Sequence, residues 1–532
     1  MLLLLIAALM LPVLAVLASW LPVGDSGALA AIILQEMAST VLPDYVETTL
    51  LLCFLVTVGV SLVGLSTAVA VTLFDFPGRR MFEWALLLPL AMPAYVVAYA
   101  YTDFLQFSGP LQTGLRNALG AQGRMFPEVR NVAGAAWVFT FALYPYVYLL
   151  ARTALGERTV HLMEAARLMG APLGRRIRAV ALPLARPAVA AGVALALMET
   201  LADFGVSSYF GIQTFTAGIY KAWLAMDNRI AAAQLATLLL VLVAILLGLE
   251  RRAQHRMRFA VTKGARAGST DAQAVPLIGR QVGAVWLLCS LPILMGFVLP
   301  VLFMLRPLTA DWAALPWLRF GEWALNSVRL GAVTAVLAVG VGVVLAFSVR
   351  RSSHWAVRTA AQLASLGYAI PGAVVVVGML LPVGWLQAWA PDWQLGYWVT
   401  ATAVGIVWAY LVRFCAVALQ ALQSGYARLP VSLDESASML GASGLQTLVR
   451  VHWPLLRRSV AVAGLLVFVD VMKELPATLV LRPFNSDTLA VVAYQLARDE
   501  RLAEAALPCL ALVLVGLIPV MLLSRTLRMA ER

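Results

Sequence analysis

Two stretches of this chain repeat one polar pattern inside an otherwise apolar sequence. The first, MEAARLMGAPLGRRIRAVALPLARP, begins at Met163, and LDESASMLGASGLQTLVRVHWPLLRR matches it without a gap 271 residues later. The matched positions are Glu164, Ala166, Gly170 and Pro183 in the first copy and Glu435, Ala437, Gly441 and Pro454 in the second. A glycine permits a turn with positive φ at a helix end, and a proline is tolerated in the first turn of the next helix.

Each stretch therefore predicts a short helix that begins at the glutamate, a sharp turn, and an amphipathic helix that leads into a membrane span. We expect Ala165, Ala166, Leu168 and Met169 to pack on neighbouring residues, while Glu164 stays available to a basic group. A helix–turn–helix joined to a span in this way transmits a displacement of a soluble partner to the membrane helix. The alternative is an ordinary loop held by interfacial helices, and two copies in register argue against it.

The apolar stretches that follow these loops carry paired carboxylates. Glu199 and Asp203 lie four residues apart, and Asp470 and Glu474 repeat them at the same offset. Residues at i and i+4 share one face of a helix, and about twelve residues at ~1.5 Å each place Glu199 near the middle of a membrane. Acidic residues inside a membrane usually face a bundle interior or an aqueous path.

Four acidic side chains along a path suit a hard cation, which prefers oxygen ligands, and Lys473 offsets one of the charges. We predict a substrate pathway of transient contacts and no fixed metal site. Two alternatives stay open. Asp203 and Glu474 would lie on the outer surface at frayed helix ends, or Glu199 and Asp470 would pair with arginine or cap a broken helix.

The composition identifies an integral membrane protein. The chain has 532 residues, of which 62% are apolar and 12% charged, whereas soluble domains carry roughly 25% charged residues. The net charge of +12 does not indicate nucleic-acid binding, because the basic residues are spread over short loops between apolar runs. Excess arginine in such loops marks the cytoplasmic face of a membrane protein.

Enzyme motifs are missing from the sequence. It contains no HExxH and no GxSxG, and its four histidines are isolated from one another. The four cysteines lie far apart within apolar segments, which favours small core residues over metal or disulfide roles. These are Cys53, Cys289, Cys415 and Cys509.

We predict an all-α fold with about twelve transmembrane helices, since each apolar run is close to the ~20 residues that span a bilayer. The candidate spans are 2–20, 48–74, 82–106, 132–151, 187–207, 230–249, 282–305, 325–348, 360–382, 398–420, 459–478 and 504–524. Most of the 39 Lys and Arg residues fall on one side if the N-terminus is cytoplasmic. The first span could instead be a signal peptide, but it lacks a basic n-region, so we expect it to be retained.

The repeat divides the chain into two parallel six-helix halves. We expect a first permease domain over 1–252, a cytoplasmic linker over 253–280 and a second permease domain over 281–532. Parallel repeats are related by an axis along the membrane normal, and a substrate path commonly lies between them.

The repeated loops resemble a known motif. EAARLMGAPLGRRIRAVALP matches the EAA loop of the permeases of binding-protein-dependent ABC importers, while Ser436 and Trp453 depart from it in the second copy. The resemblance implies two fused permease domains whose cytoplasmic loops are coupling helices, each fitting one of two copies of an ABC ATPase. The residues implied in coupling are Glu164, Ala165, Ala166, Gly170, Pro183, Glu435, Ala437, Gly441 and Pro454.

The nucleotide site of such a motor is not in this sequence. No GxxxxGK[ST] occurs, because Lys221, Lys263 and Lys473 lack the flanking glycine and hydroxyl residues. We therefore expect a transport subunit that is not an enzyme and binds no cofactor, while ATP and Mg²⁺ are used by the partner subunit.

The substrate is indicated by a second resemblance. The stretches METLADFGVSSYFG and KELPATLVLRPFNSDTLA look like those of ferric iron importer permeases. This implies a bacterial inner membrane, a periplasmic substrate-binding protein as donor, and docking of that protein on the outer loops 208–229 and 479–503. We expect the protein to contact the lipid bilayer and to bind no nucleic acid. One alternative is a permease for thiamine or polyamines; sulfate is a poorer candidate, because the paired acids disfavour an anion. Another alternative is a gradient-driven secondary transporter.

Overall fold

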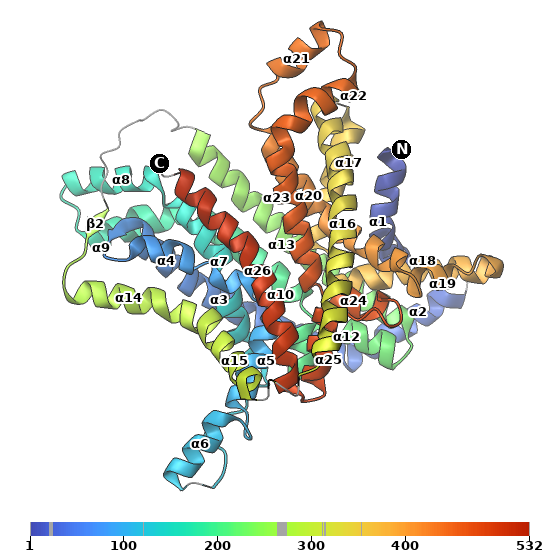
Figure 1. The fold of residues 1–532 in the computed structure, drawn as a ribbon, viewed down its shortest axis with the longest axis horizontal. Coiled ribbons are helices and arrows are strands. Elements are labelled where there is room, and N and C mark those ends of the chain that lie inside the picture. The colour runs from blue at the N-terminus through green and yellow to red at the C-terminus, as the bar shows by residue number, and fades with distance from the viewer. Residues whose placement is uncertain are drawn as a thin grey trace. The chain divides into compact units, whose positions relative to one another are not determined.

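The computed structural model describes residues 2–20, 25–120, 122–262, 274–310, 312, 315–352 and 354–530 (Figure 1). Almost all of them are helical. The strands of this part of the chain are β1 (Phe74–Asp75) and β2 (Val275–Pro276), which pair in parallel with Phe74 opposite Val275. The all-α prediction is confirmed.

The helices form two compact units, and each unit takes segments from both halves of the sequence. Unit 1 contains residues 1–40, 218–240 and 316–495, and unit 2 contains residues 41–217, 241–315 and 496–532. The predicted division into sequential domains at 253–280 therefore does not coincide with the packing, although the repeat boundary itself stays a prediction.

Unit 2 is built mainly from the first half of the sequence. Its helices are α3 (Leu42–Leu73), α4 (Arg79–Ala85), η1 (Leu88–Ala91), α5 (Ala94–Leu105), α6 (Pro110–Leu119), α7 (Val132–Ala154), α8 (Glu157–Leu168), α9 (Leu173–Arg176), η2 (Ile177–Ala181), α10 (Leu182–Ala202), α11 (Gly205–Phe210), α14 (Arg280–Ile293), η4 (Leu294–Val298), α15 (Leu299–Ala310) and α26 (Leu502–Ala530). Around α7 pack α3, α10 and α5.

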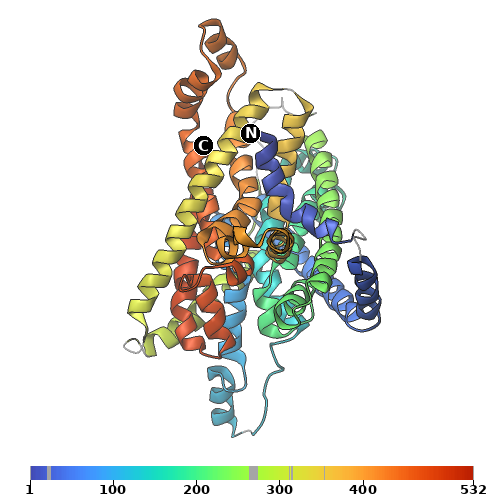
Figure 2. The same ribbon diagram turned by 90° about the vertical axis from the view of Figure 1, so that its right-hand side faces the viewer.

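Unit 1 is built mainly from the second half. Its helices are α1 (Leu2–Ala18), α2 (Asp25–Ser39), η3 (Lys221–Ala225), α16 (Trp317–Arg351), α17 (Trp355–Ser365), η6 (Gly367–Ala369), α18 (Gly372–Trp389), η7 (Pro391–Trp393), α19 (Leu395–Thr400), α20 (Ala403–Tyr426), α21 (Ser432–Met439), α22 (Gly444–Gln446), η8 (Thr447–His452), α23 (Trp453–Lys473) and α24 (Pro476–Leu481). Figure 2 shows α16 in yellow as a long helix, and it packs with α20 and α23. Three helices run from one unit into the other: α12 (Phe215–Tyr220), α13 (Arg229–Thr262) and α25 (Leu489–Arg498).

Each of the twelve expected spans coincides with helical residues. In the described part of the chain, nine helices are long and apolar enough to cross a membrane, and a bent pair makes a tenth. The other two expected spans are α1, which has 17 residues, and α23, which carries Arg457, Arg458, Asp470 and Lys473. The multi-pass membrane assignment is confirmed, with two spans that are shorter or more charged than the rest.

In two predicted spans, a proline near the middle interrupts the helix. The segment 82–106 is bent by 88° between two helical stretches, one that ends at Ala91 and one that begins at Ala94. Pro93 causes the break, because it forces the preceding Met92 into an extended conformation. In 360–382, Pro371 acts in the same way on Ile370, between η6 and α18.

The first apolar helix packs on elements of the second half. In unit 1, α1 lies along α18. The indole of Trp408 donates to the carbonyl of Ala8 at 3.0 Å, and the indole of Trp20 donates to Thr237 Oγ1 at 2.8 Å. This helix is therefore part of the folded core of unit 1.

The first span of the second half makes the reciprocal contact in unit 2. The hydroxyl of Tyr101 donates to the carbonyl of Met295 at 2.7 Å, and the rings of Phe104 and Phe303 stack at 3.8 Å. Each half thus supplies its first span to the unit formed mainly by the other half. Within the predicted linker 253–280, α13 extends to Thr262 and β2 begins at Val275, while residues 263–273 lie outside the described part.

Gly378 allows α1 to approach α18 closely, and we expect Gly378→Ala to destabilise the protein. A Cβ at this position would overlap the carbonyl of Pro12, which is backbone and cannot rotate away. We expect a loss of about 1–3 kcal/mol, as in overpacked cores, visible as a lower Tm in detergent. Gly464→Ala is the matched control, because its Cβ would meet only Val339 Cγ2 at 3.7 Å. Equal melting of the two variants would contradict the expectation.

Candidate functional site

The first repeated loop is a helix, a glycine turn and a second short helix. α8 ends at Leu168, and Gly170 has a φ of +80°. The N–H of Gly170 donates to the Arg167 carbonyl at 2.9 Å, and that of Ala171 donates to the Ala166 carbonyl at 3.0 Å. This pair of bonds is a Schellman motif, which satisfies the last carbonyls of a helix. α8 begins at Glu157, so the prediction that Glu164 starts the helix is wrong.

The second loop has the same geometry. α21 ends at Met439, and Gly441 has a φ of +76°. The N–H of Gly441 donates to the Ser438 carbonyl at 3.0 Å, and that of Ala442 donates to the Ala437 carbonyl at 3.0 Å. In Figure 1, α21 and α22 extend beyond the ends of α20 and α23 in the same unit. The predicted helix–turn–helix is therefore present in both copies.

Both loops continue into a membrane helix through a π-helical turn. The N–H of Leu182 donates to the carbonyl of Ile177, and that of Trp453 donates to the carbonyl of Leu448. The next residues are Pro183 and Pro454, which have no N–H and whose rings would clash with the carbonyl four residues earlier. The wider π turn accommodates the proline without ending the helix. Each loop is thereby joined to its span by continuous helix.

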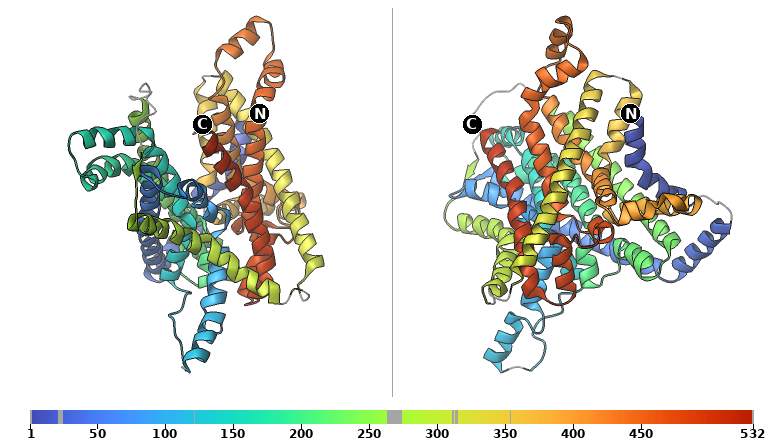
Figure 3. Two further views of the ribbon diagram at one scale, coloured as in Figure 1. Left: turned by 60° about the vertical axis from the view of Figure 1, so that its left-hand side comes forward. Right: turned by 45° about the vertical axis from the view of Figure 1, so that its right-hand side comes forward.

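The tips of both loops expose large apolar side chains. The exposed fractions are 85% for Leu168, 81% for Met169, 90% for Met439 and 87% for Leu440. The prediction that Leu168 and Met169 pack on neighbours is wrong. Ala166 and Ala437 are buried. Ala165 and the two glutamates, Glu164 and Glu435, are exposed. The hairpin of α8 and α9 is seen in teal in Figure 3.

These four tip residues are a candidate functional feature that the sequence analysis missed. The signal was an apolar pair at the same register in both copies, directly before the turn glycine. Large apolar side chains exposed on a polar surface mark interaction sites.

In the first half, the two pathway acids do not share a helical face. Glu199 lies half-buried in α10, which ends at Ala202. Asp203 has an extended conformation, and its Oδ1 accepts the N–H of Val206 at 2.8 Å in the first turn of α11. A carboxylate is stabilised at a helix N-terminus by the free N–H groups and the dipole there. The i, i+4 pattern was misleading because the helix ends between the two acids.

In the second half, Glu474 is a buried structural residue. Its side chain is 2% exposed and accepts from Arg413 NH1 at 2.8 Å. It also accepts the N–H groups of Ala477 and Thr478 at 2.9 and 3.0 Å, and the Thr478 hydroxyl at 2.6 Å. The alternative that Glu474 is a surface residue at a frayed helix end is therefore wrong, while its pathway role stays a prediction. Arg413, on α20, was not among the predicted site residues.

Comparison with known proteins assigns part of the chain to a family. Residues 60–259 match the family described as binding-protein-dependent transport system inner membrane component. These residues are therefore a permease domain of that family.

Two relatives resemble most of the permease. One is the Fe(3+)-transport system permease protein FbpB 2 of Haemophilus influenzae, 25% identical over 91% of this chain and 90% of the relative. Another is the probable ABC transporter permease protein y4fN of Sinorhizobium fredii, 25% identical over 89% and 86%. The family and the apolar helices together make the permease a multi-pass inner membrane protein.

The roles predicted for the coupling and pathway residues of the permease stay predictions. Asp470 is half-buried near the end of α23, as Glu199 is in α10. Among the described residues, no group of three or more His, Cys, Asp or Glu side chains is placed to hold a metal ion.

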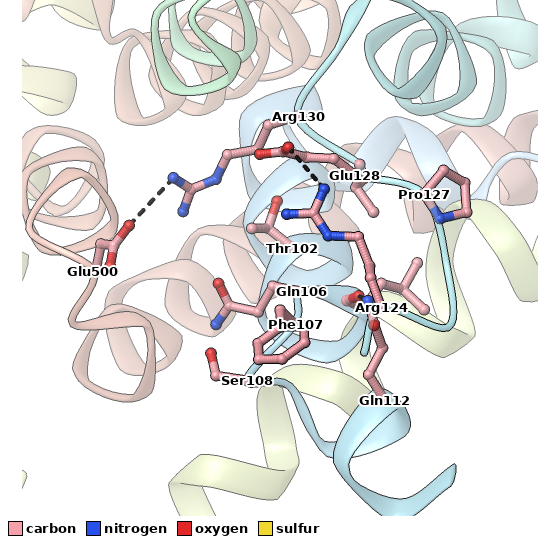
Figure 4. A pocket seen from close by; sticks show the side chains of 12 residues that line it. Thr102, Gln106, Phe107, Ser108, Gln112, Arg124, Pro127, Glu128, Arg130 and Glu500 are labelled. Atoms are coloured by element: carbon pink, nitrogen blue, oxygen red, sulfur yellow. Dashed lines mark hydrogen bonds and ion pairs between the residues drawn. The ribbon is translucent and has the colours of Figure 1, made fainter. Parts of the chain in front are cut away.

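A polar cavity of about 230 Å³ lies in unit 2 beside α5 and α6 (Figure 4). Arg130 forms an ion pair with Glu500 at 3.3 Å and lies over the ring of Tyr209, with the guanidinium carbon 4.7 Å from the ring centre. Arg124 pairs with Glu128, also at 3.3 Å. Glu500 lies in the outer loop 479–503, on which a binding protein is expected to dock, whereas Arg124 and Arg130 lie outside both expected docking loops.

Proposed function

We propose that this permease is the membrane subunit of an ABC importer that moves ferric iron across the bacterial inner membrane. A periplasmic binding protein delivers the iron, and ATP hydrolysis on separate subunits drives transport. The observation that carries the proposal is the pair of loops with the same turn geometry and the same exposed apolar tip.

The loops provide the link to the motor. Each presents an apolar tip, two residues long, in a loop whose glutamate is also exposed, and continues as helix into α10 or α23. Apolar side chains that insert into a partner's pocket supply most of the binding energy of an interface. Two loops fit two copies of the ATPase, and ATP and Mg²⁺ would be held by those subunits.

Ferric iron is favoured by three lines of support. One relative that aligns over nearly its whole length is named as an Fe(3+)-transport permease, and the stretches after both loops look like those of ferric permeases. In addition, Glu199 and Asp470 are carboxylates of membrane helices, and oxygen ligands suit a hard cation.

The proposed orientation has the N-terminus and both loops in the cytoplasm. Arg176→Cys and Gln446→Cys test it, because a membrane-impermeant thiol reagent added to intact cells should leave both unlabelled. Labelling from outside would put the loops out of reach of an ATPase and overturn the proposal.

Reconstitution tests the function directly. Proteoliposomes that contain the permease and its ATPase, supplied with the iron-loaded binding protein, should accumulate ⁵⁵Fe only when ATP is present on the side of the membrane where the ATPase lies. Uptake by the permease alone, driven by a proton or sodium gradient, would instead favour the secondary transporter.

The double variant Glu199→Ala with Asp470→Ala is expected to lower ⁵⁵Fe uptake about tenfold or more, equivalent to roughly 1.4 kcal/mol or more of the transport barrier. The reason is the loss of one oxygen ligand from each half of the pathway. Pull-down of the ATPase should be unchanged. Glu322→Ala, which removes an exposed glutamate of α16, is the control. Wild-type uptake by the double variant would remove both acids from the pathway.

A further inference from the structure

The cavity beside α5 and α6 contains an arginine that is held in position on one side. Arg130 donates from NH2 to the hydroxyl of Tyr209 at 3.2 Å, and its guanidinium carbon lies 4.7 Å from the centre of that ring. A guanidinium that stacks on an aromatic ring keeps N–H donors in its own plane for an anion. The side chain of Arg130 lines the cavity and is 27% exposed. Arg130 is therefore fixed in orientation and still reachable from outside.

The carboxylate that Arg130 binds is loosely held. Glu500 lies 3.3 Å from Arg130 NH1, and its side chain is 72% exposed. It stands in the turn between α25 and α26 with a φ of +60°. Exposed ion pairs contribute little to stability, because water and salt compete for both charges. Another carboxylate can therefore replace Glu500 on Arg130 at small cost.

The loop that carries Arg130 is fastened at both ends of its charged stretch. Before the stretch, the amide oxygen of the buried Gln112 accepts the N–H of Met125 at 3.2 Å. After it, the side chain of Asn131 accepts the N–H of Gly134 at 2.8 Å and donates to the carbonyl of Glu128 at 2.6 Å. The cavity is therefore formed by fixed backbone and does not depend on a ligand for its shape.

Arg124 supplies a second guanidinium at the cavity. It pairs with Glu128 at 3.3 Å, and the two side chains are 54% and 57% exposed. Figure 4 shows both arginine–glutamate pairs, together with the polar side chains of Gln106 and Ser108. Guanidinium N–H groups match the geometry of a carboxylate. Two arginines that are each matched by an exposed glutamate therefore suit a carboxylate as ligand.

The cavity lies at the end of unit 2 away from the first loop. Figures 1 and 3 show α6 at one end of this unit and the hairpin of α8 and α9 at the other. With that hairpin in the cytoplasm, as proposed, α6 and the cavity face the periplasm. The segment 106–131 nevertheless holds three arginines and one acid. Loops on the outer side normally carry few basic residues, so this excess indicates a specific use.

We propose that the cavity receives an acidic side chain of the periplasmic binding protein, whose carboxylate displaces Glu500 from Arg130. The inference rests on the proposed function, because that function supplies the partner. It extends the expected docking surface from 208–229 and 479–503 to the segment 106–131. Glu500 is then an internal competitor, which occupies Arg130 until the binding protein arrives.

Titration of the iron-loaded binding protein against the permease in nanodiscs tests the site, in a buffer free of carboxylates. Arg130→Ala should raise the Kd about tenfold, as expected when a central charged contact is lost, and should weaken the dependence of the Kd on salt. Glu500→Gln should lower the Kd about threefold, because it removes a competitor whose own ion pair is weak. Arg319→Ala, at an exposed arginine in the first turn of α16, is the control.

The direction of the Glu500→Gln effect separates ligand binding from a structural role. If Arg130 and Glu500 only stabilise the fold of unit 2, both variants should weaken binding and lower the Tm. A Kd for Glu500→Gln at or above that of the wild type would overturn the proposal. If Arg130→Ala fails to fold, Glu500→Gln decides alone, since a side chain with 72% exposure can be replaced without loss of packing.

Citrate tests whether the site instead takes a small free acid. Calorimetric binding of citrate that depends on Arg130, with a Kd for the binding protein that Arg130→Ala leaves unchanged, would overturn the docking role. A wild-type permease that binds no iron-loaded protein would contradict the proposed function itself. A wild type that binds this protein and imports iron, while Arg130→Ala and Glu500→Gln bind it equally well, would leave the function standing and overturn the inference alone.

Discussion

Arg413→Ala is expected to cost the permease about 3–5 kcal/mol of stability, the usual result of removing one partner of a buried ion pair. Glu474 would remain as a buried charge, with its side chain only 2% exposed. Its remaining donors, the N–H groups of Ala477 and Thr478 and the Thr478 hydroxyl, are neutral. The loss should appear as a lower Tm in detergent and less folded protein in the membrane.

The double variant Arg413→Ala with Glu474→Gln separates this cause from lost packing. Glutamine keeps an acceptor for α24 but carries no charge, so the double variant should recover much of the stability lost by Arg413→Ala. Coupled residues of this kind do not add. A double variant no more stable than Arg413→Ala would mean that the arginine acts through packing, in its contacts with Phe414, whose ring centre lies 5.1 Å from the guanidinium carbon.

Features whose cause is local could be predicted from the sequence. The turns at Gly170 and Gly441 need only a positive φ at a helix end, and that is decided within about six residues. The spans follow from long apolar runs, because the membrane selects for them irrespective of tertiary contacts. Composition and periodicity were therefore sufficient for the fold class.

Features that depend on distant partners could not be predicted. Arg413 and Glu474 are 61 residues apart, and the bond from Trp408 to Ala8 joins residues 400 apart. The packing of each first span into the unit of the opposite half has no local signal, since an apolar helix fits many apolar surfaces. The shared helical face expected for each pair of acids was wrong for a different reason. A pattern of i and i+4 assumes an unbroken helix, and both helices end one residue before the second acid.

The loop tips illustrate how burial can be misjudged in a membrane protein. Apolar residues normally lie in the core or in lipid, so Leu168 and Met169 were expected to pack. Yet they follow a charged helix and precede a turn, and their side chains are 85% and 81% exposed. The repeat was the useful signal, because two unrelated contacts would not keep the same apolar pair at the same register.

Replacing the four tip residues Leu168, Met169, Met439 and Leu440 by serine is expected to abolish association with the ATPase while leaving the permease folded. Fully burying a leucine or methionine contributes about 1.5–3 kcal/mol, so losing four such side chains should raise the Kd by at least roughly a thousandfold, even with the non-additivity usual at interfaces. Because these side chains are 81–90% exposed, their loss should leave the Tm unchanged.

The measurement is a binding titration of purified ATPase against the permease in nanodiscs, followed by ATP-driven ⁵⁵Fe uptake. Phe484→Ser is the matched control, since Phe484 is 92% exposed but lies in a loop expected on the periplasmic side. Changing the two pairs separately ranks the loops. An unchanged Kd in the quadruple variant would mean that the tips do not contact the motor, and the exposed glutamates would then have to carry the interaction alone.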